Sequence, residues 1–339
     1  MLRYATRRIL SLIPVLFGVT VIMFVVSHAV PSDPTALFLG PRASDDPVLV
    51  AAFRHRWGLD ESLIVQYGDY MRNLVHGDLG ASIFTHQTVI SDLRRYFPAT
   101  IELSLFAILI SMVVSIPLGI LAAVKRGTKF DATVRFVTLA GSSLPVFWLA
   151  LLMLQIFYLK IGIAPGPGRL STTVTPPSGS GGFYAITSFF RGDWPVFFDA
   201  LSHLIMPALV LASWSIGVIT RVTRNSMLAV LRQDYMRTAR AKGARETYLV
   251  VRHGLPNAIL PVLTLVGLAF ADLMAGAVTT ETIFAWPGIG LYSYQAATSL
   301  DFPAIMGVAL VVALTYLLTN LIVDLMYGVI DPRTRLYGR

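Results

Sequence analysis

The chain has 339 residues, of which 55% are hydrophobic and 14% are charged, and its formal net charge is +8. Because a typical soluble domain is about 25% charged, this composition argues against an ordinary water-soluble fold, and its hydrophobicity excludes a disordered chain. The absence of cysteine excludes a disulfide scaffold, a thiolate metal site and a cysteine nucleophile. A large positive charge is typical either of nucleic-acid binding or of a membrane protein, so the positions of the charges decide its meaning.

Six long segments contain almost no charged residues. A bilayer core of about 30 Å requires about 20 helical residues, and segments that are apolar on all sides differ from soluble helices, which carry one apolar stripe. We therefore expect an all-α integral membrane protein with six transmembrane helices. The expected spans are residues 9–32, 98–124, 136–159, 204–220, 255–280 and 302–328. The first span is too long for the apolar core of a signal peptide, so we expect it to be retained.

The basic residues predict the orientation of these spans. Four connecting segments hold 18 of the 27 Lys and Arg residues and only four acidic residues: 1–8, 125–135, 221–254 and 329–339. Three others hold nine basic and twelve acidic residues: 33–97, 160–203 and 281–301. Because cytoplasmic loops carry an excess of Lys and Arg, we expect both termini to be cytoplasmic. The net charge is then a topology signal rather than a nucleic-acid footprint.

Two of the expected extracytoplasmic segments are long. Segment 33–97 has mixed charge and is expected to fold onto the membrane surface. Segment 160–203 is rich in Gly, Pro, Ser and Thr, which predicts turns and extended chain rather than helix. The sequence shows no convincing internal repeat, so it gives no support for the inverted-repeat architecture of many secondary transporters.

The most specific pattern lies in segment 221–254. Asp234 is expected to cap a short helix over 235–242, and Gly243 to end that helix in the left-handed conformation. A second short helix is expected over 244–252, ending before Gly254-Leu255-Pro256. The sequence predicts a helix–turn–helix between two membrane spans.

Small residues at Ala239, Ala241 and Gly243 leave part of this element without bulk, and Lys242 supplies a hydrogen-bond donor beside them. Three interpretations remain open: a basic linker that only sets topology, a nucleic-acid helix-turn-helix, and a docking element for a cytoplasmic protein. The nucleic-acid interpretation is disfavoured because an element held between two spans has no free access to a groove.

The run Arg237-Thr238-Ala239, followed after three residues by Gly243 and then by Leu255-Pro256, resembles the cytoplasmic Glu-Ala-Ala loop of ABC-importer permeases. Arg237 and Thr238 replace the Glu and the first Ala of that pattern, and His253 replaces an Ile. The fuller run 234–243 is similar to the version in the dipeptide/oligopeptide/nickel branch. Other stretches resemble the first permease subunit of those systems, of the dipeptide-permease B type: residues 1–8, 28–34, 58–60, 76–82, 98–103, 281–290 and 331–333.

The resemblance implies the type I ABC-importer permease fold, with one permease domain over about residues 95–330, in the cytoplasmic (inner) membrane. It implies a second homologous permease, two cytoplasmic ATPase subunits that bind ATP and Mg, and an extracytoplasmic substrate-binding protein. It implies di- or oligopeptide cargo, with nickel chelates, glutathione and other small solutes as alternatives. The residues it assigns to ATPase coupling are Asp234, Arg237, Ala239, Ala241, Lys242, Gly243, Leu255 and Pro256.

We expect no catalytic, cofactor or metal site in this chain. It contains no Gly-x4-Gly-Lys-Ser/Thr phosphate loop, and its six histidines show no metal-ligand spacing. A secondary transporter remains an alternative class, although it would need no ATPase and no docking loop. A membrane enzyme would need a polar constellation near one face, and none is evident.

Two acidic residues are candidates for a translocation path or gate. Asp272 lies inside the fifth span, where a charge costs about 2.5–3.5 kcal/mol. It either lines the path and attracts cationic cargo groups, or it is protonated or pairs with a group of the second permease. Glu281 begins a Glu–Phe–Trp-Pro-Gly motif, for which a structural role and an outer-gate role both remain open.

Overall fold

The computed structural model describes residues 2–29, 46–56 and 60–330. Residues 30–32 of the expected first span, parts of segment 33–97 and the tail from 331 onward lie outside this range. Within the described ranges, five helices are long and apolar enough to cross a membrane, and one bent pair of helices is a sixth candidate. The all-α membrane architecture is therefore confirmed.

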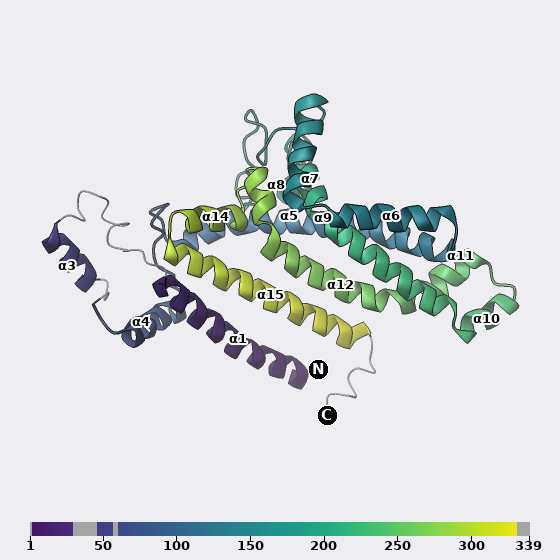
Figure 1. The fold of residues 1–339 in the computed structure, drawn as a ribbon, viewed down its shortest axis with the longest axis horizontal. Helices are drawn as coiled ribbons and strands as arrows, with labels where there is room; N and C mark the ends of the chain where they lie inside the picture. The colour runs from purple at the N-terminus through teal and green to yellow at the C-terminus, as the bar shows by residue number, and fades with distance from the viewer. Residues whose placement is uncertain (1, 30–45, 57–59, 331–339) are drawn as a thin grey trace.

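Long helices form the body of the molecule and lie roughly side by side (Figure 1). These are α1 (Leu2–Ala29), α5 (Val89–Val124), α9 (Trp194–Leu231), α12 (Leu255–Gly276) and α15 (Phe302–Ile330). Short helices occupy the two ends of this bundle. We call one the α10 end, after α10 (Asp234–Ala241), and the other the α14 end, after α14 (Ile289–Thr298).

The third expected span, 136–159, was wrong as a single continuous helix. The chain forms α6 (Lys129–Ser143) and then α7 (Val146–Met153), which continues as the π-helix η1 (Leu154–Lys160). The two parts are bent by 98° at Leu144 and Pro145. Proline disfavours the helical conformation of the residue before it, and Leu144 is accordingly extended, with φ −76° and ψ 135°.

The expectation that segment 160–203 lacks helix was also wrong in its second half. Residues 161–183 form turns, but α8 (Tyr184–Arg191) follows, and α9 begins at Trp194 rather than near residue 204. The Asp193 side chain accepts a hydrogen bond from the backbone N–H of Val196, and Pro195 lies in the first turn. Both features favour a helix start at this point.

Segment 33–97 contains short helices at its described positions. These are α3 (Pro47–Arg56) and α4 (Leu63–Val75), and α5 begins at Val89 instead of 98. Thr88 caps α5, because its hydroxyl accepts a hydrogen bond from the backbone N–H of Ser91. The helix thus begins upstream of the expected apolar span.

The centre of the bundle is packed through small residues. A Cβ atom at Gly217 of α9 would lie 2.6 Å from the Ser142 Cβ of α6, and one at Gly119 of α5 would lie 2.6 Å from the Thr223 Cβ of α9. Such small residues allow close approach of helix backbones in membranes. Helices α5, α6 and α9 are therefore held in direct contact.

Candidate functional site

Helix α10 begins one residue earlier than expected. Gln233 is the N-cap, in extended conformation, and Asp234 is the first helical residue. The Asp234 carboxylate makes no cap bond and lies 3.4 Å from a guanidinium nitrogen of Arg237. The prediction that Asp234 caps the helix was therefore wrong. The left-handed conformation expected of Gly243 is confirmed, with φ +82°.

The second expected helix, 244–252, does not end before Gly254-Leu255-Pro256. Helix α11 (Glu246–Tyr248) continues as the π-helix η2 (Leu249–Gly254), which passes directly into α12. Pro256 lies in the first turn of α12 and lacks the N–H that an uninterrupted α-helix needs. The π-helical turn just before Pro256 changes the backbone hydrogen-bond pattern, so the chain stays helical where the sequence predicted a break.

Buried side chains fix the 232–254 loop, our name for these residues, onto the bundle. Met236 and Leu249 have no exposed surface, and Val250 packs in a cluster with Met227 of α9 and Ala123 of α5. The sequence motif did not indicate these anchors. Met236 is an apolar residue in a strongly polar helix, and this contrast was the sequence signal that it is buried.

The outward face of the 232–254 loop is polar with apolar patches. The Arg240 guanidinium forms an ion pair with the Glu246 carboxylate. Tyr235, Tyr248 and Val251 are exposed. A Cβ at Gly243 would meet no atom within 4 Å, so this surface is open. The loop exposes Asp234, Arg237, Ala241, Lys242 and Gly243; Ala239 and Leu255 are partly covered, and Pro256 is exposed at the start of α12.

Glu281, in α13 (Val278–Ile283), is enclosed at the α14 end. Its Oε1 accepts a hydrogen bond from the Thr100 hydroxyl at 2.6 Å, and its Oε2 accepts one from the Leu291 N–H at 3.0 Å. Burial raises the pKa of the Glu281 carboxyl from 4.5 to about 7. A Cβ at Gly290 would lie 2.9 Å from Oε2, so the turn after α13 wraps closely around the carboxyl group.

The same turn is attached to α5. The Trp286 indole N–H donates to the backbone oxygen of Ala99 at 2.9 Å, and the Ile289 N–H donates to the Thr100 hydroxyl at 2.8 Å. Glu281 is thus linked to α5 through Thr100, and its side chain is fully buried.

A buried ion pair beside this turn was not expected. Arg169, in the Gly- and Pro-rich segment, donates to Glu102 Oε2 at 2.6 Å, and the Ile186 N–H of α8 donates to Glu102 Oε1 at 3.0 Å. The guanidinium carbon lies 3.8 Å from the centre of the Tyr184 ring. A single arginine in a segment of turns, together with an acid in a span, was the only sequence signal.

Asp272 is exposed on α12, and no hydrogen bond or ion pair joins it to the described residues of this chain. Leu268 and Ala275 of α12 are also exposed and share its helical face by their spacing. Asp272 and Glu281 therefore occupy different environments. Among the described residues, no group of three His, Cys, Asp or Glu side chains is placed to hold a metal ion.

Helices of membrane-spanning length, with a basic loop between two of them, define a multi-pass membrane protein. The chain belongs to the family of binding-protein-dependent transport system inner membrane components, whose profile matches residues 115–336. The profile of the N-terminal region of such components matches residues 1–104. It is therefore an inner-membrane permease of the ABC-importer family, and ATP hydrolysis in such systems belongs to separate subunits.

Similar proteins agree over nearly the whole chain. The probable D,D-dipeptide transport system permease protein DdpB of Escherichia coli K12 is 47% identical over 96% of each chain. The dipeptide transport system permease protein DppB of Alkalihalophilus pseudofirmus is 42% identical over 99% of this chain and 100% of its own length. These relatives confirm the resemblance to the first permease of peptide-type ABC importers.

The fold resembles a chain of the inward-facing MetNI methionine ABC transporter. The TM-score is 0.53 at 16% identity, over 71% of this chain and 97% of that chain. This similarity confirms the expected ABC-importer permease fold.

Proposed function

We propose that this chain is one of two permease subunits of a peptide importer, with the 232–254 loop docked on a cytoplasmic ATPase subunit. The observation that carries this proposal is that the loop is exposed and basic. The buried side chains of Met236 and Leu249 anchor it to the bundle, and the surface around Gly243 is free of neighbouring atoms. Relatives named as dipeptide and di/tripeptide permeases, at 42–47% identity, support peptides as the cargo. Nickel chelates and glutathione remain the competing cargoes.

The proposed orientation places the α10 end in the cytoplasm. The supporting observation is that most basic residues of the described chain lie in elements of that end, as the positive-inside tendency requires. The partner ATPases bind ATP and Mg, and a second permease completes the path for cargo delivered by an extracytoplasmic binding protein. Closure of the ATPases moves the docked loop and so shifts the permease between two states.

Asp272 is the proposed cargo-facing group of this chain. A carboxylate in a span rarely faces lipid, because its desolvation is costly. Asp272 is exposed and unpaired among the described residues. Its carboxylate therefore faces either the translocation path or the second permease. We place it on the path, where it attracts the ammonium group of a peptide. For Glu281 we propose a structural role, supporting the turn that holds the outer part of α5.

The docking proposal is tested with Gly243→Trp in the complete transporter, reconstituted in vesicles. Trp should leave membrane insertion intact, but it should reduce co-purification of the ATPase subunits or abolish cargo-stimulated ATP hydrolysis. Gly192→Trp is the matched control, because Gly192 also has positive φ (+71°) and open space around its Cβ. Gly243→Asn, which tolerates the left-handed conformation, separates bulk from backbone strain. Full coupling in Gly243→Trp would refute the docking assignment.

Cargo class requires a separate measurement on the cognate binding protein. Peptides, metal chelates and glutathione are titrated against it by calorimetry. Tight binding of peptides alone supports the proposal, and selective binding of a chelate or of glutathione overturns the peptide assignment while leaving the docking assignment intact.

A further inference from the structure

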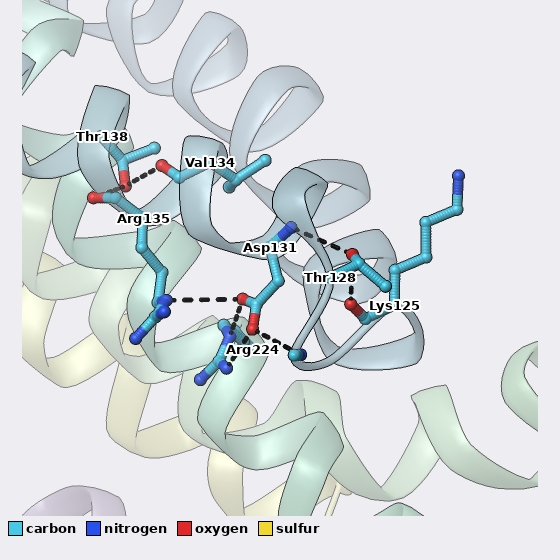
Figure 2. A network of polar contacts seen from close by, with 8 residues as sticks. Lys125, Thr128, Asp131, Val134, Arg135, Thr138 and Arg224 are labelled. Atoms are coloured by element: carbon cyan, nitrogen blue, oxygen red, sulfur yellow. Dashed lines mark hydrogen bonds and ion pairs between the residues drawn. The ribbon is translucent and has the colours of Figure 1, made fainter.

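A buried carboxylate at the α10 end lies where three parts of the chain meet. Asp131, in the first turn of α6, is 2% exposed. Its Oδ1 accepts a hydrogen bond from Arg224 Nε at 2.7 Å, and its Oδ2 accepts one from Arg224 Nη2 at 2.8 Å and one from the Gly127 N–H at 3.1 Å. Figure 2 shows the guanidinium groups of Arg224 and Arg135 directed at this carboxylate. The Arg135 contact is longer, at 3.6 Å, and Arg135 is 61% exposed.

Local structure holds Asp131 in place. Thr128 is the N-cap of α6 and accepts a hydrogen bond from the Asp131 N–H at 3.4 Å, while its hydroxyl donates to the Lys125 oxygen at 2.7 Å. A carboxylate in the first turn is also favoured by the helix dipole. The position is therefore preorganised to bind the arginine of α9 in a two-pronged geometry.

Arg224 lies close to the point where α9 leads into the 232–254 loop. Met227, about one helical turn further along α9, belongs to the cluster that anchors Val250 and Ala123. On the other side of Arg224, Thr223 and Gly217 are in tight contact with α5 and α6. The ion pair thus joins α6 to the same stretch of α9 that carries the loop.

We propose that the Asp131–Arg224 ion pair positions α6 so that it follows the movement of the 232–254 loop. This inference rests on the docking function proposed above. When the loop is displaced, the last turns of α9 move with it. Separating α6 from α9 would leave a buried carboxylate without its partner, which is strongly unfavourable, so α6 moves too. The 98° bend at Leu144 and Pro145 then divides α6 from α7 and serves as the hinge.

The test measures cargo transported per ATP hydrolysed in vesicles that contain the complete transporter. Asp131→Asn and Arg224→Lys remove the two-pronged pair with little change of size. Each should lower transport per ATP by about tenfold, within the range of interaction energies of contacting residues. The double variant Asp131→Asn/Arg224→Lys should be no worse than the worse single variant, because the two residues act as one unit. Arg135→Gln is the control, and it should change transport per ATP by less than about twofold, since its contact is exposed.

The outcomes separate positioning from mere structural support. A structural contact would lower the amount of assembled complex and its melting temperature, but the complexes that remain would transport normally per ATP. That result, or normal transport per ATP in both Asp131→Asn and Arg224→Lys, overturns the proposal. If Gly243→Trp also shows normal cargo-stimulated ATP hydrolysis, the docking proposal itself is refuted. Loss of coupling in Gly243→Trp with normal coupling in the Asp131 and Arg224 variants overturns only the role of the ion pair.

Discussion

Glu102 and Arg169 form a buried ion pair, with 2.6 Å between Oε2 and Nη2, although they are 67 positions apart in the chain. The arginine also lies over the rings of Tyr184 and Trp286, at 3.8 and 5.2 Å. This pair therefore joins α5, the Gly- and Pro-rich segment, α8 and the turn after α13. One contact organises much of the α14 end.

We expect Arg169→Ala to destabilise the protein by about 3–5 kcal/mol, because removing one partner leaves a buried charge unpaired. Thermal unfolding of the purified protein in detergent measures the loss. Replacing both partners, as Glu102→Met/Arg169→Met, should be milder than the single change. Arg191→Ala is the control, since Arg191 is exposed and, among the described residues, bonds to the backbone oxygen of Ser178 in its own segment. A double variant less stable than Arg169→Ala would contradict this account.

Glu281 should make stability depend on pH. Burial raises its pKa in the folded protein to about 7, from 4.5 in an unfolded chain. Between these values the folded state binds more protons than the unfolded state, so stability falls as pH rises, by at most about 1.4 kcal/mol per pH unit. The contribution is fully present below pH 4.5 and is lost above pH 7. Melting temperatures from pH 4.5 to 8 test this, and a slope unchanged in Glu281→Gln would contradict it.

Gly217 should tolerate no side chain. A Cβ there would lie 2.6 Å from the Ser142 Cβ and 2.8 Å from the Thr138 oxygen. We expect Gly217→Ala to destabilise the protein by about 1–3 kcal/mol, the usual effect of overpacking. Gly141→Ala is the matched control, because it is also helical but has no atom within 4 Å of its Cβ. Chemical unfolding in mixed micelles compares the two, and equal stabilities would show that α6 and α9 separate easily.

Asp272 should discriminate between cargoes if it lines the path. Asp272→Asn is expected to reduce import of peptides with a free ammonium group several-fold, while import of N-acetylated peptides stays unchanged. A single hydrogen-bonded charge contributes about 1.5–3 kcal/mol, which allows an effect of this size. Uptake of radiolabelled peptides into vesicles measures both. Equal effects on both cargo types, or no effect on either, would rule out the path-lining role; Asp272→Glu should retain the preference.

Properties that depend on residues close together in the sequence were predicted well. The long apolar stretches identified the membrane helices, because spanning a bilayer is a matter of length and composition within one segment. Gly243 was expected to be left-handed, and it has φ +82°, because a glycine at a helix end is decided by its own backbone. The order of short motifs also predicted the family that the comparisons confirm.

Some local signals were present but were given too little weight. Pro145 lies within the third expected span, and in the structure it divides α6 from α7. Asp193 and Thr88 start α9 and α5 upstream of the apolar spans that were expected there. In each case a capping residue or proline decided the helix boundary, and hydrophobicity did not.

The sequence by itself determined which segments are apolar enough to span a membrane and which segments carry the basic charge. Only the tertiary structure decided which opposite charges pair. Glu102 selects Arg169, and Asp131 selects Arg224, 93 positions away, from among 27 basic residues. Such pairing depends on helix rotation and on close approach at Gly119 and Gly217, which set the distances between side chains. These are relations between distant segments, and Coulomb interaction is strong only when packing brings the charges together and excludes water.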